Sequence, residues 1–320
     1  MPVKQAFTFN DPEGLKAVVA ERLGLDSGGL EARLLTPDFY GEVWKVESQD
    51  AAYIARLCAL STDSPRLSAK RFIQGVALEP VRLEFIKEYT SVPVPNVYFF
   101  EPHSPTLHCS LTLTENLSGR HLHQKNQEDW DSIVRAYARS IGRGLKEIHA
   151  LSHSRFGQEG DAVGLHDSWA DVFQILWEGL IQEACDDPAL VQRLFVAYER
   201  LRPFFENVPT PSLLHGNLHQ SNFLLDPSGN ITGVIDWVDS LWGDPLWDLV
   251  YLDFSNALGV SFFVEYPEAK ILIESKEGLI RGRFYEYFIY LEKILKAQKK
   301  DINLLEVLRL VAEKLEELEA

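Results

Sequence analysis

Cysteine is scarce in this sequence, which has only three such residues among 320: Cys58, Cys109 and Cys185. They are widely separated, odd in number, and none belongs to a C-x-x-C pair. A disulfide framework or a cysteine-ligated zinc site is therefore not expected. The scarcity is typical of proteins of the reducing cytosol.

Long apolar runs are also absent from the sequence. No stretch reaches the roughly eighteen uncharged apolar residues that a membrane-spanning helix requires. The opening residues MPVKQAFTFNDPEG lack the apolar core of a secretory signal. No internal repeat or low-complexity tract is present, which excludes a solenoid or a disordered linker. We therefore expect a cytoplasmic globular protein with no membrane partner.

Basic residues are outnumbered by acidic ones, 31 to 47, so the net charge is −16. A negative field repels nucleic-acid phosphates, and no nucleic-acid partner is expected. The same field attracts cationic small molecules, although many cytosolic proteins are acidic simply for solubility. With 46% hydrophobic and 24% charged residues, the composition is that of an ordinary globular protein long enough for two lobes.

The first part of the chain is predicted to be a mixed α/β unit. Apolar residues at helical spacing predict a helix near 11–23. A second helix is predicted over 79–89, with Pro80 at its first position and an end before the prolines of VPVP. Alternating apolar runs bounded by turn residues predict strands at 30–35, 41–46, 52–57, 97–100 and 107–114.

The second part of the chain is predicted to be largely helical, with a β-rich interruption at 213–237. The helices expected there are 133–151, 169–184, 189–205, 279–296 and 302–318. This order predicts an α+β fold with a small β-containing lobe, 1–114, and a larger helical lobe, 120–320. The segment ENLSG, residues 115–119, would connect them.

Residues 213–254 contain the most informative polar pattern. A strand at 223–225, the turn DPSGN and a strand at 231–235 predict a β-hairpin. Asn222 enters its first strand and Asp236 leaves its second, so both side chains should lie at the same end. A neutral oxygen ligand beside a carboxylate suits Mg²⁺, with water and nucleotide phosphates completing its shell. Alternatively, Asp236 caps a turn and Asn222 forms an Asx-turn.

The same segment resembles the aminoglycoside phosphotransferase family, a branch of the protein-kinase-like fold. Six or more spaced positions agree with the family pattern HGDxxxxN…IDW…GDPxxD, and such a spaced match is far more specific than any single element. The matching residues are His215-Gly216, Asn222, Ile235-Asp236-Trp237, Gly243-Asp244-Pro245 and Asp248. Segment 154–173 is most similar to the hygromycin-phosphotransferase-like branch.

The resemblance implies an ATP- and Mg²⁺-dependent phosphotransferase in which the matched residues have assigned roles. Asp236 and Asn222 would bind the magnesium ions that bridge the nucleotide phosphates. His215 and Asp248 would support the backbone of the loop between them. His219 would lie near the transferring phosphate, although a solvent-exposed loop histidine is an equally good interpretation.

The resemblance also implies a nucleotide site in the first lobe. Arg56 would hold the phosphates, Glu79 would pair with it, and the backbone of Glu115 and Leu117 would hydrogen-bond adenine. An exposed Arg at a strand edge is the alternative for Arg56, and an acid favoured by the dipole of a helix start is the alternative for Glu79. The loop TPDFYGE departs from the pattern of a Gly-rich nucleotide-covering loop, because it has one glycine.

Asn217 is the central departure from the family pattern, because it stands where the catalytic aspartate belongs. An asparagine accepts a hydrogen bond but carries no charge and cannot take up the proton of the acceptor hydroxyl. Losing such a group typically costs on the order of 10²–10⁴-fold in rate. The chain is then an inactivated or trapped variant, a naturally impaired kinase, or a nucleotide-binding pseudokinase.

The acceptor is expected to be a small hydroxylated molecule, possible sources being an antibiotic, another natural product, or a metabolite such as choline, homoserine or a sugar. The acidic net charge adds a preference for a cationic acceptor, for which Glu178, Glu183 and Asp239 are candidate contacts. A non-enzymatic ligand-binding protein is the remaining alternative. The sequence does not choose between ATP and GTP, or between a monomer and a homodimer.

Overall fold

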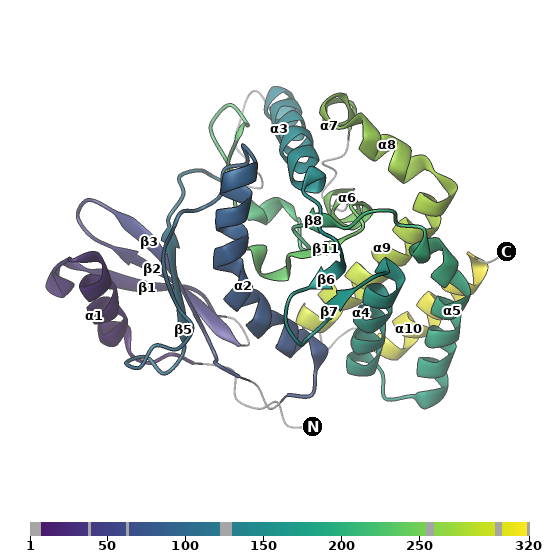
Figure 1. Ribbon diagram of the computed structural model, residues 1–320, viewed down its shortest axis with the longest axis horizontal. Helices are drawn as coiled ribbons and strands as arrows, with labels where there is room; N and C mark the ends of the chain where they lie inside the picture. Colours follow the sequence, from purple (N-terminus) through teal and green to yellow (C-terminus); the bar gives the residue numbers. More distant parts are fainter. Residues whose placement is uncertain are drawn as a thin grey trace.

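The computed structural model describes residues 8–37, 40–61, 64–121, 130–253, 259–297 and 303–318. A β-sheet lobe and a helical lobe lie on opposite sides of the long helix α2 (Figure 1). This is the α+β, two-lobed arrangement predicted from the order of the elements. Among the described residues, the two largest apolar clusters are separate, one in each lobe, and account for the division.

The first lobe is an antiparallel sheet of five strands in the order β1-β2-β3-β5-β4. The strands are β1 (Glu31–Pro37), β2 (Gly41–Glu47), β3 (Ala52–Cys58), β4 (Val97–Glu101) and β5 (Ser110–Glu115). Helix α1 (Pro12–Leu23) packs against the sheet through Leu15 and Val19, and a short 3₁₀ turn, η1 (Ser27–Gly29), follows it. Residues 38–39, within the expected nucleotide-covering loop, lie outside the described residues.

Helix α2 spans Leu67–Tyr89, so the prediction that it begins near Glu79 was wrong. Pro80 lies inside the helix, where it removes one backbone donor but is tolerated. The reason is burial: apolar residues such as Val76 and Leu83 face the interior on both sides of the proline. Gly75 lets the helix approach the second lobe closely, since a Cβ at this position would lie 2.0 Å from the Val238 carbonyl oxygen.

The second lobe is built from helices around a large aromatic core in which Phe173 and Trp247 are central. Its helices are α3 (Trp130–Ala150), α4 (Trp169–Ala184), α5 (Pro188–Glu206), α6 (Leu246–Asp253), α7 (Val260–Glu265), α8 (Pro267–Glu274), α9 (Lys276–Ala297) and α10 (Leu304–Glu317). Within the described ranges, no helix is long and apolar enough to cross a membrane.

Short strands embedded among these helices carry the polar pattern of residues 213–254. A four-stranded sheet of order β7-β6-β11-β8 and the two-stranded hairpin β9–β10 lie at the inner side of this lobe (Figure 1). The elements are β6 (Phe156–Gln158), β7 (Gly164–His166), β8 (Ser212–Leu214), η2 (Gln220–Asn222), β9 (Phe223–Leu225), β10 (Ile231–Val234), η3 (Trp237–Asp239) and β11 (Leu241–Gly243).

Candidate active site

The β9–β10 hairpin brings Asn222 and Asp236 to one end, as the strand pattern predicts. The two strands pair antiparallel, with Phe223 opposite Val234. The Ile235 N–H donates to the carbonyl of Asn222 across 3.0 Å and closes this end of the hairpin. An amide side chain and a carboxylate therefore leave the hairpin side by side.

The fully buried Asp248 of α6 holds the loop 215–222 in place. Its carboxylate accepts hydrogen bonds from the backbone N–H groups of His215 at 2.8 Å and Gly216 at 3.0 Å. His149 of α3 lies 3.3 Å from the same carboxylate through Nε2, and its Nδ1 lies 3.1 Å from the Tyr266 hydroxyl. A buried carboxylate with several donors stabilises one conformation of the loop.

His215 connects the loop to the segment that carries Asp236. Its imidazole is buried, with Nε2 3.0 Å from the Ile235 carbonyl oxygen. The ring packs on the indole of Trp237 at a centroid distance of 4.5 Å. These contacts place the side chain of His215 in the interior, away from any substrate-accessible position.

Asn217 is half-buried and shares hydrogen bonds with both neighbours that the sequence pattern selects. Its backbone carbonyl oxygen accepts from Asn222 Nδ2 at 2.9 Å and from the His219 N–H at 3.0 Å. The loop thus links the expected base position directly to an expected metal ligand. The half-buried His219 also accepts the Asn222 N–H through its carbonyl at 2.9 Å.

Arg56 lies between the two lobes and bridges two acids. Its Nη2 donates to the Asp236 carboxylate at 2.9 Å, and its Nε lies 3.2 Å from Glu79 Oε2. The alternative of an exposed strand-edge Arg was wrong, because β3 is an interior strand and the side chain is 16% exposed. Arg56 thus connects the first-lobe sheet, helix α2 and the hairpin.

Glu79 is inside α2 rather than at its start, so the alternative of a helix-entry acid was wrong. Besides Arg56, the carboxylate accepts the Trp237 N–H at 3.0 Å. Burial raises the pKa of Glu79 above its ordinary value of 4.5; Arg56 and the Trp237 N–H lower it, and Asp236 raises it. Removing the carboxylate from water outweighs its partners.

Asp236 adopts a left-handed backbone conformation, with φ 68° and ψ 61°. A non-glycine residue in this region is strained, and such strain clusters at ligand-binding positions. No group of three or more His, Cys, Asp or Glu side chains that could hold a metal occurs in the described part of the chain. A site of one carboxylate and one amide is instead suited to an ion that keeps water and phosphate ligands.

The expected hinge leads from β5 to the hairpin. Glu115 ends β5, and its carboxylate accepts from Asn96 Nδ2 at 2.5 Å. Further along, Arg120 and Leu225 exchange backbone hydrogen bonds of 3.0 and 2.9 Å, and Thr232 donates to the Ser118 carbonyl at 2.7 Å. The segment carrying Leu117 therefore runs beside the hairpin.

The three acids considered as cation contacts, Glu178, Glu183 and Asp239, have different positions and partners. Glu183 of α4 accepts from the N–H and hydroxyl of Ser68 at 2.9 and 2.6 Å, and so caps the start of α2. Glu178 accepts from Gln174 within α4 at 2.8 Å. Asp239 alone follows the hairpin directly, in η3.

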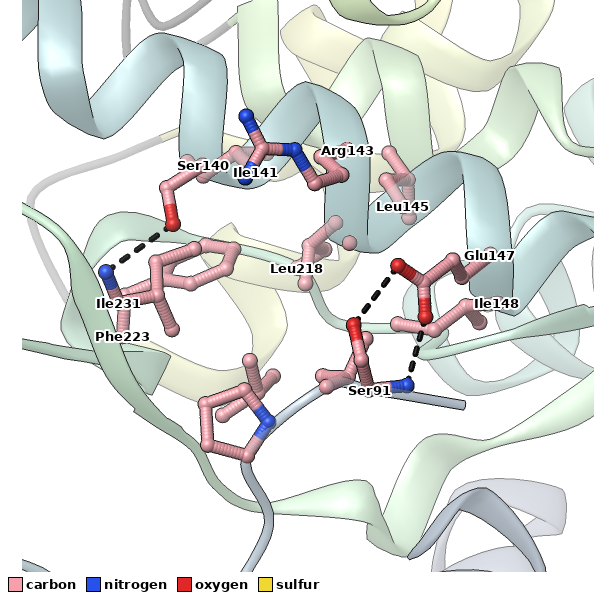
Figure 2. A pocket seen from close by; sticks show the side chains of 14 residues that line it. Ser91, Ser140, Ile141, Arg143, Leu145, Glu147, Ile148, Leu218, Phe223 and Ile231 are labelled. Atoms are coloured by element: carbon pink, nitrogen blue, oxygen red, sulfur yellow. Dashed lines mark hydrogen bonds between the residues drawn. The ribbon is translucent and has the colours of Figure 1, made fainter. Parts of the chain in front are cut away.

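A cavity of about 170 Å³ lies between α3, the Ser91–Pro93 segment and the hairpin. Figure 2 shows Leu218 of the loop and Phe223 of the hairpin on its wall, opposite Ile141 and Leu145 of α3. At its edge, the N–H and hydroxyl of Ser91 bind Glu147. Apolar packing therefore supports the loop from the side of α3.

Residues 31–277 match the sequence model of the phosphotransferase enzyme family, which is more than half of the chain. The chain belongs to this family. Among curated proteins, the uncharacterized protein YcbJ of Bacillus subtilis (strain 168) is 27% identical over 197 residues, 56% of this chain. The chain spans 58% of the length of that relative.

Solved structures with a similar fold include members of two groups of kinases. A "putative fructosamine-3-kinase" from Haemophilus somnus 129PT is 18% identical, with a TM-score of 0.69 over 94% of this chain and 96% of that chain. Aminoglycoside phosphotransferase APH(4)-Ia with ADP and hygromycin B is 17% identical, with a TM-score of 0.63 over 96% and 98%. The GDP complex of aminoglycoside 2'-phosphotransferase-IIIa is 14% identical, with a TM-score of 0.62 over 97% and 99%. Together these likenesses show the protein-kinase-like fold.

Sequence reasoning about this phosphotransferase missed the groups that complete the buried support of the loop. His149 of α3 contacts Asp248, and Tyr266, between α7 and α8, contacts His149. His149 lies within the predicted helix 133–151, and a histidine in that helix was the available signal. Its pairing with a residue far along the chain could not be read from local spacing.

Proposed function

We propose that this phosphotransferase moves the γ-phosphoryl group of ATP to a hydroxyl group of a small molecule, in the presence of Mg²⁺. The observation that supports the proposal most is the hydrogen bond from Asn222 Nδ2 to the backbone carbonyl of Asn217 at 2.9 Å. It couples a residue with a metal-binding side chain to the position where the acceptor hydroxyl would be oriented. Positioning supplies most of the catalysis in this class of reaction.

Asn222 and Asp236 have the oxygen chemistry that Mg²⁺ prefers. The Asn222 amide nitrogen is occupied by the Asn217 carbonyl, which leaves Oδ1 for the ion. One Asp236 oxygen pairs with Arg56, and the carboxylate is 36% exposed, so it remains accessible from the cleft. Asn222 and Asp236 would hold Mg²⁺, which would neutralise the charge of the nucleotide phosphates.

Arg56 would bind the phosphates, with Glu79 orienting its guanidinium. The buried Glu79 carboxylate is anchored by the Trp237 N–H, so its second oxygen presents a fixed partner to Arg56. An Arg presents a planar set of donors that matches phosphate oxygens. In this proposal Arg56 exchanges its contact with Asp236 for the phosphates when nucleotide binds.

Residues 115–119 would form the hinge between a nucleotide lobe, 1–114, and a lobe for the acceptor, 120–320. The backbone of Glu115 and Leu117 would hydrogen-bond adenine. The contacts of Arg120 with Leu225 and of Ser118 with Thr232 support this assignment, because they hold the segment beside the hairpin. The base would then lie at one end of the cleft and the phosphates at the Asn222–Asp236 end.

Asn217 would orient the acceptor hydroxyl through its amide oxygen but could not accept the proton. Transfer by the chain as written would therefore be slow, with the proton leaving to water. His219, two residues along, would lie near the transferring phosphate. A nucleotide-dependent binding protein is the second candidate function, and Asn217 is the observation that favours it.

The acceptor class is proposed from the names of the structural neighbours and the presence of a hydroxyl-directed site. Aminoglycosides and fructosamines are the first acceptors to try, followed by choline, homoserine and simple sugars. These molecules share accessible hydroxyl groups and small size.

Equilibrium binding of ADP with and without Mg²⁺ tests the nucleotide and metal parts of the proposal. We expect Mg²⁺ to strengthen ADP binding in the wild type, and Asp236→Asn to remove most of this gain. Asp186→Asn, at an exposed position between α4 and α5, is the matched control. Equal ADP affinity with and without Mg²⁺ in every protein would contradict the proposed metal site.

A further inference from the structure

Arg71, in the second turn of α2, is a largely buried cation whose Nε atom has no hydrogen-bond partner in the described part of the chain. Its side chain is 11% exposed. The Nε atom is buried and has no hydrogen-bond partner among the described residues. The nearest acid, Asp239, has its Oδ1 3.9 Å away, which is beyond hydrogen-bond distance.

An unsatisfied buried guanidinium is costly, because an Arg is always charged and carries five N–H donors. Two other buried arginines have stronger polar contacts: Arg82 donates from Nη2 to Glu159, although its own Nε has no partner either among the described residues. The buried Arg281 donates from Nε to Asp244 at 2.7 Å and from Nη1 to the Phe204 carbonyl at 3.0 Å. Arg71 has no comparable hydrogen bond among the described residues, only the 3.9 Å contact with Asp239, and this points to a ligand.

Asp239 connects Arg71 to the segments that carry Asp236 and Asn217. Asp239, its neighbour, is three residues beyond Asp236. The Asp239 backbone carbonyl also packs against Gly216, so closely that a Cβ on Gly216 would lie 2.1 Å from that oxygen. Gly216 immediately precedes Asn217. Arg71 is thus linked through one residue to both sides of the proposed reacting centre.

The acids around Arg71 do not compensate it completely. Tyr251 of α6 lies within electrostatic range of Arg71 and Asp239, and burial raises the pKa of its hydroxyl well above the usual value. That neutral hydroxyl donates to Glu292 at 2.9 Å, so the Glu292 carboxylate is already engaged. Lys293 adds a second positive charge 5.5 Å from the centre of the Tyr251 ring.

Building on the proposed function, we propose that Arg71 binds an oxyanion group, a carboxylate or a phosphate, that the acceptor molecule carries besides its reactive hydroxyl. The acceptor is then an acidic small molecule, such as a hydroxy acid or a sugar phosphate. A guanidinium recognises such groups with paired hydrogen bonds. The local cation outweighs the negative net charge, because short-range contacts are screened far less than distant charges.

The test compares neutral and anionic molecules of one carbon framework on protein saturated with Mg²⁺ and AMP-PNP. Calorimetric titrations use glycerol against glycerate, and glucose against gluconate and glucose 6-phosphate, with glucosamine as the cationic member. We expect at least one anionic member to bind about tenfold or more tightly than its neutral counterpart. Arg71→Gln should abolish that preference, and Arg71→Lys should restore part of it.

Lys70→Gln is the matched control, since Lys70 is the exposed neighbour of Arg71 and carries the same charge. It should leave the preference unchanged. The nucleotide's own phosphate is the competing source of the oxyanion, so AMP-PNP affinity is measured in every variant. A large loss of AMP-PNP affinity in Arg71→Gln would assign Arg71 to the nucleotide and overturn the proposal.

Two further results decide the outcome. If no anionic member binds better than its neutral counterpart to the wild type, the proposal is wrong even where Arg71→Gln fails to fold. If the nucleotide itself does not bind, the failure lies with the proposed function rather than with the role of Arg71.

Discussion

Arg56 of β3 donates a hydrogen bond of 2.9 Å to the carboxylate of Asp236, 180 residues further along the chain. The contact joins the lobe proposed to bind nucleotide to the carboxylate proposed to bind Mg²⁺. It neutralises Asp236 while no ion is bound, and Glu79 keeps the guanidinium in place at 3.2 Å. Nucleotide binding would thus replace one charge pair by another within a prepared site.

Arg56→Met should weaken binding of Mg²⁺-ADP by about 10- to 100-fold, because charge-assisted hydrogen bonds to phosphate are lost. It should also lower the free energy of unfolding by about 3 kcal/mol, since the buried Glu79 loses its cation. Calorimetry and urea denaturation measure the two effects. Arg33→Met on the exposed edge strand β1 is the control and should change neither. Unaltered nucleotide affinity in Arg56→Met would refute the assigned role.

Glu79 should make the free energy of unfolding depend on pH. Its pKa is raised in the folded state above the ordinary 4.5, mainly by burial. The folded state therefore binds the proton more tightly, and this contribution to stability is lost as pH rises through the folded pKa. Wild-type stability should fall relative to that of Glu79→Gln between about pH 4 and the raised value. Parallel urea-denaturation curves for the two proteins across this range would argue against the raised pKa.

The hairpin end could be predicted from sequence because its parts are local. A turn of DPSGN between two short apolar strands places Asn222 and Asp236 together whatever surrounds them. The start of α2 could not be predicted from sequence, because Pro80 is a strong local signal for a helix start. Only the tertiary burial of Val76 and Leu83 overrides this signal.

Contacts between distant segments were the other limit of the sequence. Asp248 is contacted by His149 of α3, and His149 is in turn contacted by Tyr266, far along the chain. Likewise, the spacing of Arg71 and Asp239 in the sequence does not predict that they approach each other. Such pairs depend on how whole helices pack.

Asp248→Asn should destabilise the fold and loosen the loop 215–222. The carboxylate is fully buried and accepts the N–H groups of His215 and Gly216. An amide can replace only part of this acceptor capacity, and a loss of about 2–4 kcal/mol in unfolding free energy is expected. Asp186→Asn, which is exposed, should lie within about 0.5 kcal/mol of wild type. If the two substitutions cost the same in urea denaturation, Asp248 does not support the loop.

Gly216→Ala should cost more than either of two control glycines. Gly216 has φ +82°, and a Cβ there would lie 2.1 Å from the Asp239 carbonyl oxygen. Gly24→Ala keeps the positive φ but has open space, so about 1 kcal/mol is expected. Gly29→Ala has neither constraint and should be nearly neutral. Thermal unfolding measures the loss of stability in each variant. A loss that decreases in the order Gly216, Gly24, Gly29 supports the close packing of the loop on η3. Equal losses at Gly216 and Gly24 would contradict it.

The central claim is that a phosphotransferase site is intact around an asparagine in the base position. Phosphate transfer from ATP with Mg²⁺ to hydroxylated acceptors, measured for this chain and for Asn217→Asp, tests it most directly. The acceptors include the neutral and cationic molecules named above together with glycerate, gluconate and glucose 6-phosphate. We expect Asn217→Asp to transfer phosphate on the order of 10²–10⁴-fold faster, with unchanged ATP affinity. If both proteins bind ATP and neither transfers phosphate to any acceptor, the claim fails and a nucleotide-dependent binding protein takes its place.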